Sequence, residues 1–98
     1  MSNVMKYHRP QRVSSLIKEE LNKIILRELE FDGAVMTILE VDVSDKLEGA
    51  VVKFAVYPPN KGPDVLLQLV KRRDHLQFLL LRKINIKPMP KIIFQLAQ

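Results

Sequence analysis

The chain has 98 residues, of which 47% are hydrophobic and 28% are charged, and this is the length and composition of one globular domain. It contains no cysteine, which excludes a disulfide framework, a thiolate metal site and a cysteine nucleophile. Its apolar runs are only a few residues long, and its first residues, MSNVMKYHRPQR, form no apolar leader. We therefore expect neither a membrane span nor a secretory signal, and we expect the protein in the cytoplasm.

The net charge of +5 is distributed unevenly along the chain. Residues 1–18 carry four cations and no acid, residues 19–70 carry five cations and ten acids, and residues 71–98 carry seven cations and one acid. Basic ends on either side of an acidic middle suggest a face that binds a polyanion and is built from both ends of the chain. The alternative is an ordinary charged surface that only keeps the protein in solution.

The first predicted element is a helix over residues 11–30. The spacing i, i+3, i+4 places five apolar side chains on one helical face: Val13, Leu16, Ile17, Leu21 and Ile24. Glu19 and Lys23 are spaced as an i, i+4 ion pair on the exposed side. Asp32-Gly33 then provides a typical helix end.

Two strands joined by a hairpin are predicted next. Residues 35–43 end in alternation, which places Leu39, Val41 and Val43 together on one face of a half-buried strand. Residues 50–57 are rich in β-branched and aromatic side chains and alternate in the same way. The connector SDKLEG has the length and chemistry of an antiparallel hairpin.

A second helix and a third strand complete the predicted order α-β-β-α-β. The helix begins near Pro63, which suits a first turn, and Asp64 lies near the positive end of the helix dipole. Pro88 and Pro90 close the helix, and residues 92–96 form the last strand.

The second helix contains the sequence KRRDH, residues 71–75, whose cations interrupt an apolar face. A straight helix turns by about 100° per residue and would place Arg73 between Leu69 and Leu76, at the centre of that face. A buried and unpaired guanidinium would destabilise the fold strongly. We therefore predict that the helix bends or breaks near Arg72–Asp74 and turns the cations outward. The alternative is a straight helix from which Arg73 extends its charged end to solvent.

Five short groups of residues, in this order and at this spacing, resemble one known family. They are Arg9-Pro-Gln-Arg12-Val13; Glu20-Leu21 with Ile24-Ile25; Met36-Thr37-Ile38 through Val41-Asp42-Val43-Ser44; Leu47 with Ala50 and Val52; and Pro90 with Ile92 and Phe94. Together they are similar to the ribosome-binding factor A family, over nearly the whole chain.

The resemblance implies an α+β fold: a single KH-like domain over residues 1–98, α-β-β-α-(kink)-α-β, with a three-stranded sheet and helices packed on one face. We expect residues 1–8 to form a flexible N-terminal arm. The resemblance also implies a function, which is binding to the small ribosomal subunit and its rRNA during late maturation. Such a factor assists 16S-type rRNA processing and subunit assembly, and it leaves before translation.

The sequence departs from the KH and family patterns at two points. No glycine follows Gly62, so the Gly-x-x-Gly loop with which KH domains clamp single strands is missing. The family has a short Ala-x-Gly turn in its interrupted helix. This turn aligns here with Arg72-Arg73-Asp74, so neither its alanine nor its glycine is present. These departures leave the expected fold intact and concern the details of RNA contact.

No catalytic constellation is found in the sequence, and no cofactor is expected. His8 and His75, without any cysteine, make a weak metal pair and are interpreted as surface residues. Four acids suggest a divalent cation site less well than a solvated face: Glu40, Asp42, Asp45 and Glu48. The sequence therefore predicts a binding protein and not an enzyme.

The predicted RNA-binding residues are basic. They are Arg9, Arg12, Lys71, Arg72, Arg73, Arg82, Lys83, Lys87 and Lys91. Phosphate contacts from such residues supply most of the affinity, and the shape of the RNA supplies selectivity. Tyr7 and Tyr57 are candidates for stacking on bases, although Tyr57 equally fits packing at a strand end. Three phenylalanines are predicted in the core: Phe54, Phe78 and Phe94.

Two other functions remain open at this point. The domain could be a KH-like basic module that binds an acidic protein or another RNA, and a weak salt dependence of binding would favour the protein partner. Binding to an anionic membrane surface fits less well, because the basic segments lack a Trp-rich amphipathic face. We expect the free protein to be a monomer.

Overall fold

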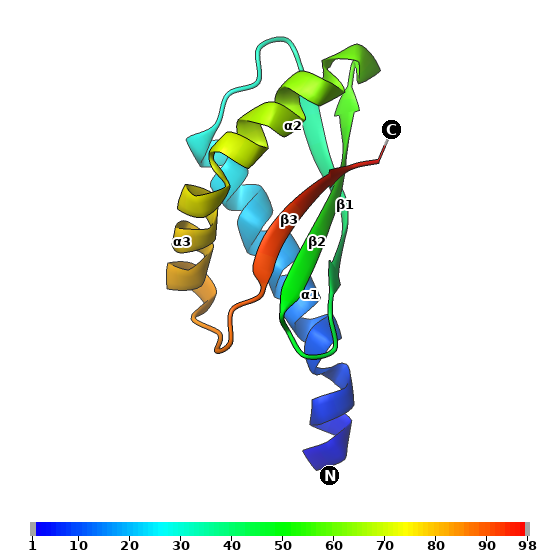
Figure 1. Ribbon diagram of the computed structural model, residues 1–98, viewed down its shortest axis with the longest axis vertical. Helices are drawn as coiled ribbons and strands as arrows, with labels where there is room; N and C mark the ends of the chain where they lie inside the picture. Colours follow the sequence, from blue (N-terminus) through cyan, green and yellow to red (C-terminus); the bar gives the residue numbers. More distant parts are fainter. Residues whose placement is uncertain (1, 98) are drawn as a thin grey trace.

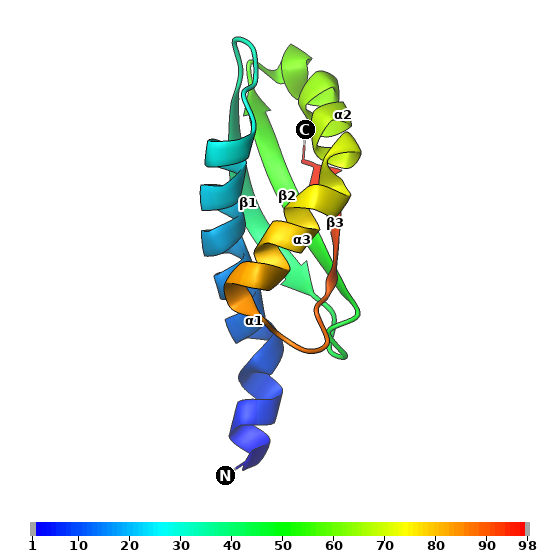
Figure 2. The same cartoon turned by 90° about the vertical axis from the view of Figure 1, so that its left-hand side faces the viewer.

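The chain folds into two layers, a three-stranded sheet and a layer of helices over one of its faces (Figures 1 and 2). The computed structural model describes the backbone of residues 2–97 and the side chains of residues 10–97, so the arm expected over residues 1–8 stays a prediction. The elements in chain order are α1 (Ser2–Glu28), β1 (Val35–Val43), β2 (Gly49–Tyr57), the 3₁₀ turn η1 (Pro59–Lys61), α2 (Gly62–Lys71), α3 (Arg73–Ile84) and β3 (Lys91–Leu96). The predicted α+β class and order of elements are confirmed.

The sheet has the order β1-β2-β3, with β2 antiparallel to β1 and parallel to β3. A tight turn makes the predicted hairpin: the Ser44 amide donates to the Gly49 carbonyl at 3.0 Å, and the Ser44 hydroxyl accepts from the amides of Glu48 and Gly49. Leu47 takes a left-handed conformation in this turn, with φ 59°. That conformation is unfavourable for leucine, but it buries the side chain in the core.

The register of β1 shifts at Leu39, and the predicted alternation is wrong there. Ile38 pairs with Phe54 and Glu40 pairs with the adjacent Lys53, so Leu39 is an extra residue in a β-bulge. Its side chain is exposed, whereas Ile38 and Val41 on either side of the bulge are buried. The bulge reverses the alternation once, and this keeps the apolar residues of both halves of β1 on the core side.

Helix α1 buries the predicted face except at one position. Ile17, Leu21 and Ile24 are buried as predicted, and Ile25 joins them, whereas Leu16 is exposed. Each residue turns the helix by about 100°, so Leu16 lies about 140° around the helix from Leu21, outside the buried stripe. The predicted stripe was therefore too wide on this side.

The bounds and the surface pairing of α1 also differ from the prediction. The helix begins at Ser2 and ends at Glu28. On its exposed side Lys23 pairs with Glu20 at 3.6 Å, and not with Glu19 as the spacing predicted. Although α1 has 27 residues, neither it nor any other helix in the described part of the chain is apolar enough to cross a membrane.

The predicted break in the second helix is confirmed and lies at Arg72. This residue has φ −99° and ψ 6°, outside the helical range. Its amide donates to the Gln68 carbonyl at 3.1 Å and its carbonyl accepts from the Leu76 amide at 2.9 Å, so the two helices meet directly at one residue. Leu69 and Leu76 are both fully buried on either side of the break.

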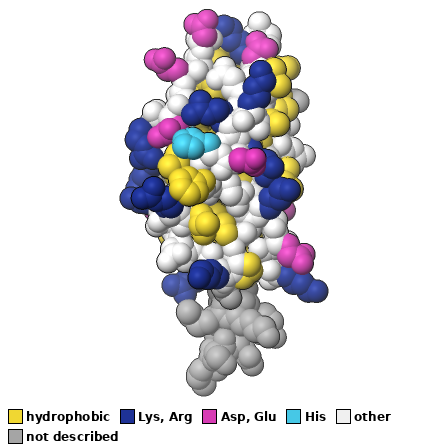
Figure 3. Space-filling model, turned by 60° about the vertical axis from the view of Figure 1, so that its left-hand side comes forward, with side chains coloured by type: hydrophobic (Ala, Val, Ile, Leu, Met, Phe, Trp, Pro, Cys, Tyr) yellow, Lys and Arg dark blue, Asp and Glu magenta, His cyan; other side chains and the backbone are white. Residues whose placement is uncertain are grey.

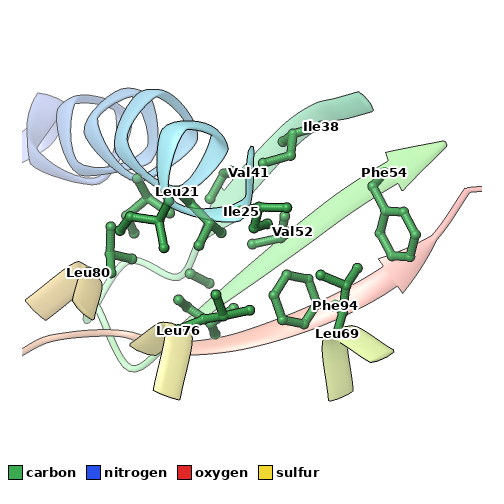
Figure 4. Packing of buried hydrophobic residues seen from close by; sticks show 14 of the residues in the cluster. Leu21, Ile25, Ile38, Val41, Val52, Phe54, Leu69, Leu76, Leu80 and Phe94 are labelled. Atoms are coloured by element: carbon green, nitrogen blue, oxygen red, sulfur yellow. The ribbon is translucent and has the colours of Figure 1, made fainter. Parts of the chain in front are cut away.

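The core lies between the sheet and the three helices (Figure 4). The rings of Phe54 on β2 and Phe94 on β3 meet edge to face, with centroids 6.4 Å apart. Phe78 does not join them: it is 54% exposed, and its prediction as a core residue is wrong. It lies two residues from both Leu76 and Leu80, which are buried, so it points to the opposite side of α3.

Candidate nucleic-acid interface

The first basic cluster lies at the break between α2 and α3. Lys71 ends α2, Arg72 lies between the helices and Arg73 begins α3. Lys71 and Arg72 are exposed, whereas the Arg73 side chain is 28% exposed and its Nη2 lies 3.1 Å from Asp74 Oδ1. At the break two of the three cations are therefore exposed and the third is partly covered. The N-terminus of α3 adds the positive end of its dipole at the same place.

The second basic cluster lies at the other end of α3. Arg82 and Lys83 are in the last turn of the helix, and Lys87 follows in the loop to β3. All three side chains are exposed. A helix rises by about 1.5 Å per residue, so the two clusters lie about 15 Å apart along α3. A polyanion that follows the helix would meet both.

Of the other predicted cations, Lys91 lies apart from these clusters. Lys91 begins β3, and because strand residues alternate between faces, it points away from the helices while Ile92 is buried toward them. Arg12 is exposed on α1, the helix that lies beside α3 (Figure 2). The side chains of Tyr7, His8 and Arg9 lie outside the described residues. The structure therefore groups six of the nine predicted cations around α3 and places Lys91 on the opposite face.

Two acids beside or within α3 are paired with cations. Glu28, at the end of α1, lies 3.3 Å from Arg27 Nε and 3.5 Å from His75 Nε2, and the second contact joins α1 to α3. The hydrogen bond from Arg27 lowers the pKa of Glu28 below its usual 4.5; partial desolvation opposes this, and the hydrogen bond from His75 adds to it. Asp74, the single acid in α3, pairs with Arg73. The surface along α3 therefore keeps an excess of positive charge.

An exposed aromatic ring lies between the two clusters, and the sequence prediction missed it. Phe78 is 54% exposed, and the Arg82 guanidinium lies over its ring, 5.7 Å from the centroid. Figure 3 shows hydrophobic side chains among Lys and Arg side chains on this face of the molecule. The signal that could have found the ring is its position: two residues from each buried leucine of α3, on a helix with one buried side.

The face of the sheet away from the helices carries the remaining candidates. Tyr57 is 75% exposed, so it does not pack at the end of β2, and its place in the strand puts it on this face. Glu40 pairs with Lys53 across the strands at 3.1 Å. Among the described residues, no group of three or more His, Cys, Asp or Glu side chains could hold a metal ion.

Comparison with known proteins points to one family. The family model described as ribosome-binding factor A matches residues 9–98. Ribosome-binding factor A of Akkermansia muciniphila is 30% identical over 88 residues, which cover 90% of this chain and 70% of the relative. The factor of Chloroherpeton thalassium is 33% identical over 89 residues, which cover 88% of this chain and 71% of the relative.

Solved structures show the same fold. The crystal structure of ribosome-binding factor A from Thermus thermophilus superposes with a TM-score of 0.73 at 18% identity, and the match covers 88% of this chain and 93% of that one. A second Thermus thermophilus structure is a homology model of the factor fitted into the cryo-EM map of a 30S complex. It gives a TM-score of 0.71 at 20% identity and covers 83% of this chain and 87% of that one.

Proposed function

The chain belongs to the ribosome-binding factor A family, and on that basis we propose that it binds the small ribosomal subunit and its rRNA during late maturation. In this role it assists 16S-type rRNA processing and subunit assembly, and it leaves before translation begins. The family match over residues 9–98 carries the proposal. The role is one of binding and includes no catalytic step; it is carried out in the cytoplasm, by a protein that is a monomer when free.

The proposed contact surface runs along the outer side of α3, which we call the α3 surface. It includes Lys71 and Arg72 at one end and Arg82, Lys83 and Lys87 at the other, all exposed. Lys and Arg contacts to phosphates release counterions, so binding through this surface weakens as salt rises. The positive end of the α3 dipole supports phosphate binding at the helix break. Contacts to the RNA backbone read shape, which suits recognition of a folded rRNA.

The experiment that tests the function is sedimentation of the tagged protein through a sucrose gradient. We expect it with free small subunits and depleted from translating ribosomes, because a maturation factor must leave before translation. Deletion of its gene should let precursor small-subunit rRNA accumulate. Equal occupancy of translating ribosomes, together with normal rRNA processing in the deletion strain, would overturn the proposal.

A matched pair of variants tests whether the α3 surface makes the contact. Arg72→Gln/Arg82→Gln removes one exposed cation from each cluster, whereas Lys46→Gln/Lys91→Gln removes two exposed cations elsewhere, with the same change in net charge. Only the first variant should shift toward the top of the gradient. A similar shift for both would mean that net charge, and not this surface, determines binding. Binding of purified protein that hardly changes with salt would indicate an acidic protein partner in place of RNA.

A further inference from the structure

Three planar side chains form a stripe on the outer side of α3. His75, Phe78 and Arg82 are spaced i, i+3 and i+7, so they follow one side of the helix over about 10 Å. His75 is 47% exposed and Phe78 is 54% exposed, and Arg82 is exposed as well. Imidazole, phenyl and guanidinium groups each present a flat face that can stack on another π system.

Phe78 is the part of the stripe that the fold itself does not use. The neighbouring turns of α3 bury Leu76 and Leu80 completely on the other side of the helix, so Phe78 adds little to the core. Its ring contacts the Arg82 guanidinium, 5.7 Å from the centroid, and this arrangement leaves more than half of the residue in solvent. A single exposed phenylalanine is ordinary on a protein surface. This one is distinguished by the charges around it.

The charges around the stripe favour an anionic ligand over an apolar protein surface. Exposed cations lie at both ends of it, Lys71 and Arg72 before His75 and Lys83 after Arg82. The acids beside the stripe are both paired: Asp74 with Arg73, and Glu28 of α1 with Arg27 and His75. A ligand that fits must carry a flat apolar face together with negative charge on either side. An unpaired nucleotide in an RNA strand has both, since its base is planar and its phosphates flank it.

We infer that Phe78 stacks on an unpaired base of the RNA that the protein binds. Arg82, already over the ring, contacts the phosphate of the same nucleotide, and the cations at the two ends of α3 hold the strand along the helix. This rests on the proposed function but goes further. Phosphate contacts alone could be made with a double helix, whereas a base can stack on Phe78 only where the strand is unpaired. Single-strand selectivity would thus arise without the Gly-x-x-Gly loop that this chain lacks.

A tryptophan substitution gives a direct readout, because the chain contains no tryptophan. Phe78→Trp places one fluorophore in the stripe, and Tyr57→Trp places one at an exposed aromatic position on the opposite face. We expect an unstructured RNA oligonucleotide to quench the first and not the second at the same degree of saturation. A fully paired RNA duplex should quench neither. Stacking on a base quenches indole emission, so quenching only at residue 78 with the single strand is the expected signature.

Affinity measurements on the full chain separate this inference from the function on which it rests. Phe78→Ala should bind the single-stranded oligonucleotide about 5- to 150-fold more weakly, since one stacked base is lost. Its salt slope should be unchanged, because no charge is removed. Phe78→Tyr should bind like the unmodified protein, because the tyrosine ring still stacks. Phe78 is exposed, so its alanine, tyrosine and tryptophan variants should all fold with an unchanged melting temperature.

Three results would overturn the inference. If Phe78→Ala binds the oligonucleotide with unchanged affinity while Arg72→Gln/Arg82→Gln binds more weakly, the protein contacts phosphates but no base stacks on Phe78. Loss of small-subunit binding by Phe78→Ala, with its affinity for the oligonucleotide unchanged, would show that the ring meets a protein. Finally, failure of the unmodified protein to bind single-stranded RNA at low salt would overturn it while the sedimentation result still decides the function.

Discussion

Two helical stretches of similar length cover the same face of the sheet, yet only one of them is continuous. Helix α1 runs unbroken for 27 residues although it contains Pro10, whereas α2 and α3 are separate helices of 10 and 12 residues whose one proline, Pro63, lies in the first turn of α2 and not at the break. The difference lies in where the cations fall. In α1 the cations Lys18 and Lys23 lie off the buried face. A straight α2–α3 helix, in contrast, would place Arg73 on its own buried face.

The comparison indicates that the break depends on where the cations lie around the helix relative to its buried residues. It does not depend on a helix-breaking residue such as proline. By interrupting the helix at Arg72, the fold keeps Leu69 and Leu76 fully buried and avoids a guanidinium between them. The same interruption takes Arg72 out of the helix and creates a second helix N-terminus beside the exposed Lys71 and Arg72. The packing requirement and the candidate RNA surface therefore have one structural origin.

The largest effect is expected where both stretches are alike, on their buried sides. Leu21→Ala in α1 and Leu76→Ala in α3 should each lower the free energy of unfolding by about 2–5 kcal/mol, because both side chains are fully buried and leave a cavity. Denaturant unfolding measures this. The control is Leu26→Ala on the exposed side of α1, which should change stability by no more than about 0.5 kcal/mol. Losses below about 1 kcal/mol at both buried sites would mean that the core is wrongly placed.

A smaller effect distinguishes the continuous helix from the break. Glycine destabilises a helix interior by about 1 kcal/mol relative to alanine. Glu19 is an exposed position inside α1, so Glu19→Gly should be less stable than Glu19→Ala by about 1 kcal/mol in the free energy of unfolding. The backbone of Arg72 is not helical, so the difference between Arg72→Gly and Arg72→Ala should be less than about half of the difference at Glu19. Equal differences at the two positions would mean that α2 and α3 join into one helix in solution.

The sequence was sufficient for features that depend on local spacing. The break at Arg72 could be predicted because Leu69, Arg73 and Leu76 lie within two turns of one helix. The bulge at Leu39 could not, since it depends on how β1 aligns with β2 across a hairpin. Phe78 differs from its prediction for another reason: aromatic residues are usually buried, but its angular position relative to Leu76 and Leu80 puts it on the outer side of α3.

The candidate site shows the same division between local and tertiary information. All of the cations at the ends of α3 were identified from charge alone. Charge could not reveal that Lys91 points to the opposite face of the sheet, because that depends on which side the helices cover. Nor could it reveal that Arg73 stays partly covered beside Asp74. The sequence thus predicted that the surface is basic, and the structure was needed to show which of the predicted cations lie on it.

The cations at the break should affect binding more than stability. Arg72→Gln should change the free energy of unfolding by no more than about 0.5 kcal/mol, since its side chain is exposed. Arg73→Gln should cost slightly more, because its stem is partly covered. Each substitution that removes a phosphate contact should reduce the slope of log affinity against log salt by about one unit. A loss of stability in an Arg72→Gln/Arg73→Gln double variant, with an unchanged salt slope, would mean that these cations serve the fold alone.

The smallest effect concerns the contact that joins α1 to α3. The pKa of Glu28 is lowered in the folded protein, first by the hydrogen bond from Arg27 and also by that from His75. A carboxyl group with a lowered pKa contributes stability above its unfolded pKa and loses this contribution as pH falls through the folded pKa. Glu28→Gln should therefore be slightly less stable than the unmodified protein near neutral pH.

That difference should disappear in acid, and the pH dependence identifies its source. Urea unfolding of both proteins over a series of pH values from neutral to acid should give a gap that narrows as the pH falls and the carboxyl group becomes protonated. In an Arg27→Gln background the gap at neutral pH should shrink, because Arg27 is the main cause of the lowered pKa. A gap that is the same at all of these pH values would instead reflect altered packing at the end of α1. Since this contact lies at the surface and the core residues lie beneath it, even its full loss should leave α1 and α3 packed against each other through Leu21 and Leu80.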